Sequence, residues 1–308
     1  MIAASSKRAR TAETVPAADA APTPSHTAAH EARGPGETRL EFAVDAEGRT
    51  YLASHFASYP HHLTRAFYLD RAAPQAATVY LQSLSGGLTQ DDRVSMRIST
   101  TGGAVAHVTT QAATKVHSME RGFALQQVSL AALAHSHLEF LADPTICFPH
   151  SRLVAKADLC VATEASAIVG DSYMWHDPRG ADPMAFDALT METTIRRPDG
   201  RLLALDRGRL TSGQGLAGNP ALLGPYRALG TLFAVGRGCS DAAALAAVRA
   251  AFADLPGVYV GVTQLPAEAG LWLRILAIDG AALRTAMECA WQQCHLGMLG
   301  WACDRRRK

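Results

Sequence analysis

Short runs of alternating apolar and polar residues follow one another through most of the chain. Residues 94–99 read Val-Ser-Met-Arg-Ile-Ser, and residues 39–44 alternate in the same way. A period of two is typical of a strand with one buried face. Comparable segments cover residues 104–108, 152–160, 167–169 and 186–196. We therefore predict a mainly β protein.

Turn residues separate these segments. Asp45-Ala46-Glu47-Gly48 and Arg197-Pro198-Asp199-Gly200-Arg201 each stand between two strand patterns. Proline presets φ for a turn and glycine accepts a positive φ, so both sequences predict hairpins. Glycine pairs at residues 86–87 and 102–103 predict further sharp turns. We expect many short antiparallel strands, in a sandwich or an irregular solenoid-like body, over residues 37–228.

The pattern changes near residue 229. Strands are predicted at residues 229–235, 258–262 and 271–278, and helices at residues 242–253 and 281–296, with Ser240-Asp241 as the first cap. This β-α-β-β-α order implies two helices on one face of a small antiparallel sheet. We place this α+β lobe, residues 229–308, in the same domain as the β-rich body.

Composition limits the class of protein. Residues 1–36 are rich in Ala, Pro, Ser and Thr, so we expect a disordered tail. Basic and acidic residues number 29 and 28, which argues against nucleic acid or a membrane surface as the main partner. Six cysteines without a C-x-x-C pair, and no signal-peptide pattern, predict reduced thiols in the cytoplasm.

Motifs of catalysis are absent from the sequence. There is no G-x-S-x-G, no H-E-x-x-H and no phosphate-binding G-x-x-x-x-G-K-[ST]. Residues 213–218 match G-x-G-x-x-G, but the preceding segments are predicted hairpin strands and not a βαβ unit. We therefore expect no catalytic activity and no nucleotide site.

Two groups of residues offer metal-ligand chemistry. His135 and His137 stand two apart on a predicted strand close to Glu139, so they could begin a nickel or zinc site, although a solvated or hydrogen-bonded pair is the favoured interpretation. Cys289, Cys294 and His295 lie on the predicted last helix. Thiols five residues apart on a helix do not converge, so buried cysteines are expected there.

A threonine-rich stretch, residues 109–115, reads Thr-Thr-Gln-Ala-Ala-Thr-Lys between apolar strands. One interpretation is an edge strand with a threonine ladder, since threonine is a strong strand former. The other is a surface that a ligand or a partner chain recognises. The residue types leave both open.

The Gly86-Gly87 turn followed by Asp91, the block at residues 109–116 and Leu138-Glu139-Phe140-Leu141 together resemble the UreD (UreH) family of urease accessory proteins. The resemblance is good over residues 54–209 and loose elsewhere. Leu84-Ser85 replaces an expected proline pair, and Phe140 an expected tryptophan.

The resemblance implies a non-catalytic β scaffold that binds apo-urease and a UreF-type protein, and through the latter a UreG-type GTPase, so that nickel reaches urease. The positions that match the family are Gly86, Gly87, Thr109, Thr110, Gln111, Thr114 and Lys115. Oxygen ligands release Ni²⁺ more readily than thiolates or several imidazoles do. We therefore expect nickel in transit and no tightly bound cofactor, with Asp91, Glu139, Asp143 and Asp171 as candidates for the nickel path.

Two other classes of protein compete with this hypothesis. A β-rich module that binds small ligands would explain the polar threonines, but only 6% of the residues are aromatic. A hydrolase on an unfamiliar β fold would need a convergent group in a cleft, for which His61, His62, Asp91 and Asp143 are the candidates.

Overall fold

The computed structural model describes residues 36–180, 184–212, 219–304 and 306. All of them belong to one compact unit, Pro35–Lys308. The predicted disordered tail lies outside the described residues except for Gly36, and so does the glycine-rich loop at residues 213–218.

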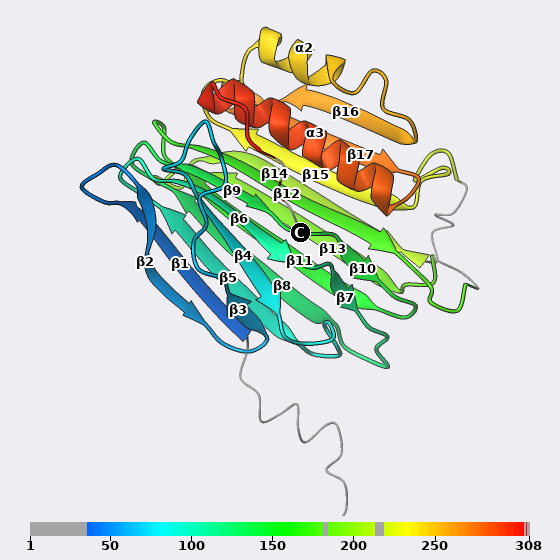
Figure 1. Ribbon diagram of the computed structural model, residues 1–308. Helices are drawn as coiled ribbons and strands as arrows, with labels where there is room; N and C mark the ends of the chain where they lie inside the picture. Colours follow the sequence, from blue (N-terminus) through cyan, green and yellow to red (C-terminus); the bar gives the residue numbers. More distant parts are fainter. Residues whose placement is uncertain (1–35, 181–183, 213–218, 305, 307–308) are drawn as a thin grey trace, which may run out of the picture. The chain divides into compact units, whose positions relative to one another are not determined.

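Over the described ranges, two β-sheets form the body of this unit (Figure 1). Sheet A has seven strands in the order β14-β13-β11-β8-β5-β1-β2. In chain order these strands are Gly36–Val44 (β1), Thr50–Ala57 (β2), Arg93–Thr100 (β5), Ala124–Ala132 (β8), Arg152–Val161 (β11), Ala188–Arg196 (β13) and Leu202–Thr211 (β14).

Sheet B has ten strands. Its main path runs β16-β17-β15-β12-β9-β6-β4-β3, while β10 pairs with β12 and with β7. In chain order these strands are His61–Leu63 (β3), Ala77–Ser83 (β4), Val105–Gln111 (β6), Thr114–Val116 (β7), His137–Leu141 (β9), Thr145–Cys147 (β10), Ser166–Trp175 (β12), Ala228–Val235 (β15), Val258–Gln264 (β16) and Gly270–Ala277 (β17).

Most neighbouring strands run parallel, which corrects the antiparallel arrangement expected from the sequence. In sheet A, β5 pairs parallel with β1 and β8, and β11 with β8 and β13; in sheet B, β6 pairs parallel with β4 and β9. The chain crosses between sheets after most strands, so neighbours are successive coils of a solenoid. The mainly β, solenoid-like prediction is confirmed. Alternation shows which face is buried but not the direction of the partner strand, and Gly102-Gly103 carries the chain to the other sheet instead of closing a hairpin.

The two predicted hairpins are confirmed. Strands β1 and β2 pair antiparallel around the Asp45–Gly48 turn, where the Asp45 carboxylate accepts the backbone N–H of Arg49 over 2.8 Å. Strands β13 and β14 also pair antiparallel, and Gly200 has the positive φ of 88° that their turn requires.

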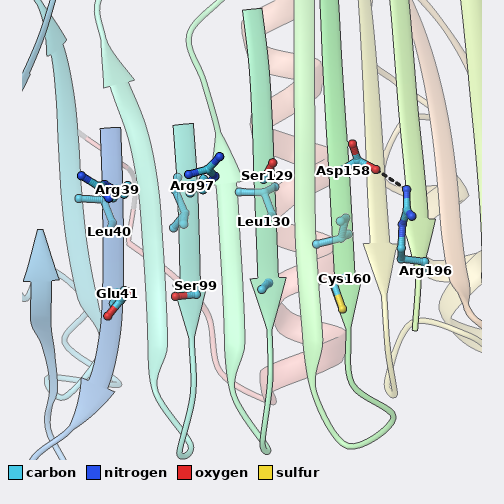
Figure 2. A pocket seen from close by; sticks show the side chains of 13 residues that line it. Arg39, Leu40, Glu41, Arg97, Ser99, Ser129, Leu130, Asp158, Cys160 and Arg196 are labelled. Carbon is cyan, nitrogen blue, oxygen red and sulfur yellow. Dashed lines mark hydrogen bonds and ion pairs between the residues drawn. The ribbon is translucent and has the colours of Figure 1, made fainter. Parts of the chain in front are cut away.

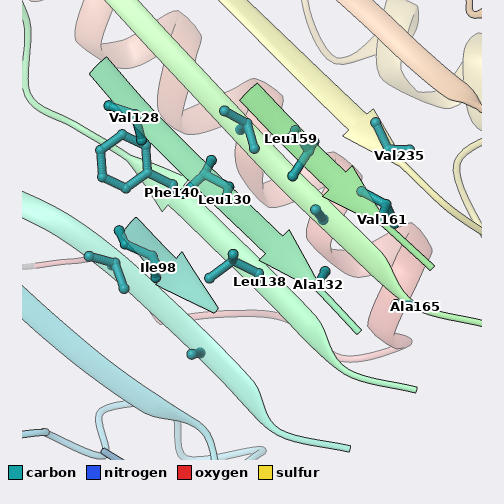
Figure 3. Packing of buried hydrophobic residues seen from close by; sticks show 14 of the residues in the cluster. Ile98, Val128, Leu130, Ala132, Leu138, Phe140, Leu159, Val161, Ala165 and Val235 are labelled. Carbon is teal, nitrogen blue, oxygen red and sulfur yellow. The ribbon is translucent and has the colours of Figure 1, made fainter. Parts of the chain in front are cut away.

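Side chains from both sheets fill the space between them (Figure 3). The alternation in the sequence sends every second residue of a strand inward, where burial of a large aliphatic side chain contributes about 1.5–3 kcal/mol. Sheet A contributes Ile98, Val128, Leu130 and Leu159, and sheet B contributes Leu138, Phe140 and Val235.

Helices α2 (Ala242–Ala250) and α3 (Gly280–Leu299) lie on the outer face of sheet B (Figure 1). They follow β15 and β17, with a short 3-10 turn, Pro266–Glu268, before β17, so the predicted β-α-β-β-α order is confirmed. Asp241 and Asp279 cap the two helices through their carboxylates. In the part of the chain that the structure describes, no helix is both long and apolar enough to cross a membrane.

Glycines allow α3 to approach the sheet closely. A Cβ on Gly230 of β15 would lie 2.7 Å from Sδ of Met287, and one on Gly170 of β12 would lie 3.0 Å from its Cε. The first distance is shorter than real contacts and the second is tighter than most, so an added Cβ at either position would force the Met287 side chain to shift. Because α3 packs this closely on sheet B, its last turns lie over β6 and β9.

Candidate functional site

The Gly86-Gly87 turn packs against strand β7. The backbone N–H of Leu88 donates to the Lys115 carbonyl over 2.7 Å, and that of His117 donates to Leu88 over 2.9 Å. A Cβ on Gly87 would lie 2.5 Å from the Lys115 oxygen, so this position, with φ 140°, requires glycine. The structure therefore brings together two segments that the sequence keeps 27 residues apart.

These two segments, Gly86-Gly87 and Thr114-Lys115, are called the motif junction below. They line a cavity of about 200 Å³ that also touches Val94 and Met96 of sheet A. Leu84, just before the turn, leaves 65% of its surface exposed. The junction therefore offers an accessible surface with both apolar and charged groups.

Thr109, Thr110 and Gln111 are placed differently. Strand β6 lies between β4 and β9, so the edge-strand interpretation is wrong for residues 109–111, whereas Thr114 and Lys115 lie on β7, which pairs with β10 alone among the described strands. The Thr109 hydroxyl donates to the Leu141 carbonyl over 2.5 Å, and the Thr110 hydroxyl accepts the Asp143 backbone N–H over 2.7 Å. The two threonines therefore tie the end of β9 and the start of the following loop to β6. Only Gln111 is exposed.

Two of the proposed nickel-path carboxylates lie away from the interior. Asp91 occupies an exposed turn with φ 62°, and it is Asp92 whose carboxylate accepts the Thr89 backbone N–H over 2.6 Å. Asp143 is half-buried in the loop after β9.

The two histidines proposed as a pair do not share a strand face. His135 lies in an exposed turn with φ 61°, whereas His137 begins β9 and is buried. The Ser136 backbone N–H closes that turn on the Leu133 carbonyl over 3.1 Å. Because the local turn overrides the period-two pattern, the prediction that both imidazoles lie on one face of a strand is wrong.

Glu139 has a different environment from the other candidate acids. It is 2% exposed, lies on the face of sheet B beneath α3, and its carboxylate accepts four N–H groups. A carboxylate can only accept, so each ring nitrogen facing it carries hydrogen. The four donors are His107 Nδ1 at 2.7 Å, His137 Nε2 at 3.2 Å, Trp291 Nε1 at 2.9 Å and His295 Nδ1 at 2.6 Å.

These contacts decide the charge of the cluster. Burial raises the pKa of Glu139, but the hydrogen bonds from His107, His137 and His295 outweigh it and hold the pKa well below its ordinary value. The carboxylate is therefore ionised. The second nitrogen of His137 lies 2.7 Å from the Ser166 hydroxyl.

Asp171 lies between the sheets. It stands on β12 between Val169 and Tyr173, which belong to two different clusters of the interior core. The Tyr173 hydroxyl donates to its Oδ2 over 3.3 Å, while Oδ1 is buried without a hydrogen-bond partner among the described residues. Burial raises the pKa of Asp171 to about 6, against the opposing charge of Arg274. Arg274 itself is bound by both carboxylate oxygens of Asp206.

A shallow hollow of about 570 Å³ lies on the outer face of sheet A (Figure 2). Arg39, Arg97 and Asp158 lie in a row across the strands, and Asp158 pairs with Arg196. Burial raises the pKa of the Cys160 thiol in the same hollow, so this cysteine is not an activated nucleophile.

The residues named for a hydrolase lie in different parts of the fold. His61 lines the cavity at the motif junction and its Nδ1 lies 2.9 Å from the Thr38 hydroxyl, while His62 is exposed. Asp91 is in its exposed turn and Asp143 in the loop after β9. Their placement offers no support for a hydrolase.

Sequence reasoning named Glu139 and His137 together, but it grouped His295 with the cysteines of the last helix and missed His107 and Trp291, so it did not find the cluster. His107, Trp291 and His295 lie on β6 and α3, up to 156 residues from Glu139. One local signal was available, since a histidine inside the apolar run Ala106-His107-Val108 must find a polar partner once buried. Nothing in the sequence identifies that partner.

Comparison with known proteins agrees with these motifs. The family model of the UreD urease accessory protein matches residues 34–307. Urease accessory protein UreD 1 of Methylorubrum populi is 39% identical over 261 residues, which cover 85% of this chain and 88% of that protein. UreD 1 of Bradyrhizobium sp. is 38% identical, over 87% of this chain and 95% of the relative. UreD of Natronomonas pharaonis is 31% identical, over 87% and 90%. The chain therefore belongs to the UreD family of urease accessory proteins.

Proposed function

We propose that this protein is a non-catalytic maturation factor that binds apo-urease and a UreF-type accessory protein, and through the latter a UreG-type GTPase. The observation that carries this proposal is the family match over residues 34–307. GTP hydrolysis belongs to the partner, and this chain contributes a scaffold. All six cysteines are free, which suits a reducing cytoplasm.

The motif junction is the proposed contact surface for one of these partners. Its cavity, the exposed Leu84 and the exposed Lys115 provide apolar and charged contacts side by side. Rigid backbone pairing between Leu88 and Lys115 keeps this surface preorganised, which lowers the entropy cost of binding.

Nickel is the cargo, and Asp171 is the proposed principal carboxylate of its path. A carboxyl with a pKa of about 6 and an unsatisfied Oδ1 can exchange its proton for a cation near neutral pH. A single oxygen ligand of this kind also releases nickel readily. Asp91 is exposed and Asp143 half-buried, so both stay candidates for the outer part of the path, whereas Glu139 is buried beneath α3 and does not suit rapid exchange of an ion in transit.

Co-expression with a UreF-type protein and apo-urease tests the scaffold. The chain is expected to co-purify with both; failure to retain either would contradict the proposal. Nickel per urease then tests the path, with Asp171→Asn expected to lower it while the complex still assembles. Asp158→Asn, on the outer face of sheet A, is the matched control and should load nickel normally. Unaltered loading with Asp171→Asn would remove Asp171 from the path.

A further inference from the structure

The cluster around Glu139 has the composition of a metal site. Ligand atoms of His137, Glu139 and His295 all lie within 4.8 Å of one another, and His107 reaches the other carboxylate oxygen over 2.7 Å. We propose that His137, His295 and Glu139 bind one divalent transition-metal ion that stays with the chain, while His107 keeps its hydrogen bond to the other carboxylate oxygen. The site is separate from Asp171, and its existence does not depend on the proposed role in urease maturation.

The distances are close to those that an ion needs. Bonds of about 2.0–2.1 Å from a tetrahedral metal to its ligands place the ligand atoms roughly 3.4 Å apart. Oε1 of Glu139 is now 3.2 Å from His137 Nε2 and 2.6 Å from His295 Nδ1. The ligand atoms of His137 and His295 lie within 4.8 Å of each other, so the three ligand atoms surround a space close to the size that an ion needs.

The ring nitrogens that face away from Glu139 have surroundings compatible with a metal-bound state. In that state each ligating nitrogen gives up its hydrogen, which moves to the opposite ring nitrogen. His137 then donates from Nδ1 to the Ser166 hydroxyl, now 2.7 Å away, as ligand histidines usually do to a neighbouring acceptor.

In the hydrogen-bonded arrangement, His295 still has one ring nitrogen without a partner among the described residues. Its Nε2 is buried and has no hydrogen-bond partner among the described residues. The ring of Trp301 stands at 84° to it, with centroids 4.2 Å apart. A hydrogen on Nε2 can donate to this aromatic ring, whereas a lone pair there gains nothing.

The ligand types indicate which ions would bind. Two imidazoles and one carboxylate favour Zn²⁺, Ni²⁺ or Co²⁺ over Mg²⁺ and Ca²⁺. Since the ligands are buried beneath α3, exchange should be slow, which suits a resident ion better than one in transit. This differs from the expectation, drawn from the sequence, that no ion is tightly held. The ion would join β9 and α3 and so stabilise the fold.

Metal content and thermal unfolding of the full-length chain test the site. Chain stripped with a chelator is incubated with Zn²⁺ or Co²⁺ and dialysed. We expect about one ion retained per chain, a metal-dependent rise in Tm of several degrees, and visible absorption of tetrahedral Co²⁺. Retention of less than about a tenth of an ion by the wild-type chain would overturn the proposal.

Variants locate the ion. His295→Gln keeps an N–H donor for Glu139 but removes the imidazole, and should abolish retention and the metal-dependent rise in Tm. His135→Gln, in the exposed turn outside the cluster, is the matched control and should behave as wild type. Equal retention by His295→Gln and wild type would place the ion elsewhere.

If His295→Gln does not fold, Ser166→Ala decides instead. This variant should weaken metal affinity about 10–100-fold, and unchanged affinity would contradict the site.

Discussion

Trp291 donates its indole N–H to Oε2 of Glu139 over 2.9 Å and so joins helix α3 to strand β9, 152 residues earlier in the chain. A buried carboxylate is costly unless its acceptor positions are filled. The contact therefore fixes the position of α3 on sheet B, together with the apolar contacts of Leu283, Ala286 and Ala290.

Trp291→Phe tests this link. Removal of the donor leaves part of a buried, ionised carboxylate unsatisfied, which should lower the free energy of unfolding by about 1–3 kcal/mol beyond the effect of ring size. Urea unfolding gives the difference. Trp272→Phe is the control, because its indole nitrogen has no hydrogen-bond partner in the described part of the chain. Equal losses in both variants would contradict a specific role of the Glu139 contact.

Asp171→Asn should stabilise the protein at pH 7.5. The folded state raises the pKa of this carboxyl from 3.8 to about 6, so the folded state binds its proton more readily than the unfolded state does. Wild-type stability therefore falls as the pH rises from about 4 to 6, and the neutral amide avoids this loss.

The expected gain for Asp171→Asn is about 1–3 kcal/mol at pH 7.5, and it should disappear below about pH 4. Urea unfolding across this pH range measures it. Asp158→Asn, which removes an acid paired with Arg196 on the surface, should change stability by less than about 0.5 kcal/mol. A variant at residue 171 that is destabilised at pH 7.5 would contradict the raised pKa.

Arg306→Ala should destabilise the protein. Arg306 and Asp70 form a buried pair, with side chains 6% and 2% exposed and nitrogen–oxygen distances of 2.9 and 2.7 Å. Burial raises the pKa of Asp70, but the hydrogen bond and charge of Arg306 outweigh it, so the net effect is a lowered pKa. Without the arginine a buried charge is left unpaired, which costs about 3–5 kcal/mol.

The loss of unfolding free energy in Arg306→Ala should depend on pH. A carboxyl with a lowered pKa contributes stability above its ordinary pKa of 3.8, and this contribution is lost as the pH falls through the folded value. Denaturant unfolding should therefore show a large deficit at neutral pH that shrinks in acid. Arg207→Ala, from an exposed pair with Glu192, should cost less than about 1 kcal/mol throughout.

Gly87→Ala tests the motif junction. The new Cβ would collide with the Lys115 carbonyl at 2.5 Å, and φ of 140° is unfavourable for alanine, so unfolding free energy should fall by about 1–3 kcal/mol. Under the proposed function, partner co-purification should weaken as well. Gly86→Ala is the neighbouring control, because nothing lies within 4 Å of its added Cβ. Equal effects on unfolding at both positions would contradict the close contact at Gly87.

The sequence by itself determined the β class, the faces of the strands, the Asp45 and Gly200 hairpins and the two C-terminal helices. Each depends on residues near one another in the chain: the period of two, the turn chemistry and the capping aspartates. The family motifs are also local and could be recognised without the fold.

Only the tertiary structure decided strand direction, the place of Thr109 and Thr110, and the environment of each acid. Alternation is identical in parallel and antiparallel strands, so it could not reveal the solenoid path. The set around Glu139 forms only when β6, β9 and the end of α3 meet, because His295 is 156 residues away along the chain. Long-range packing, which no local pattern encodes, therefore buried Glu139 among four N–H donors and left Asp171 with an unsatisfied oxygen.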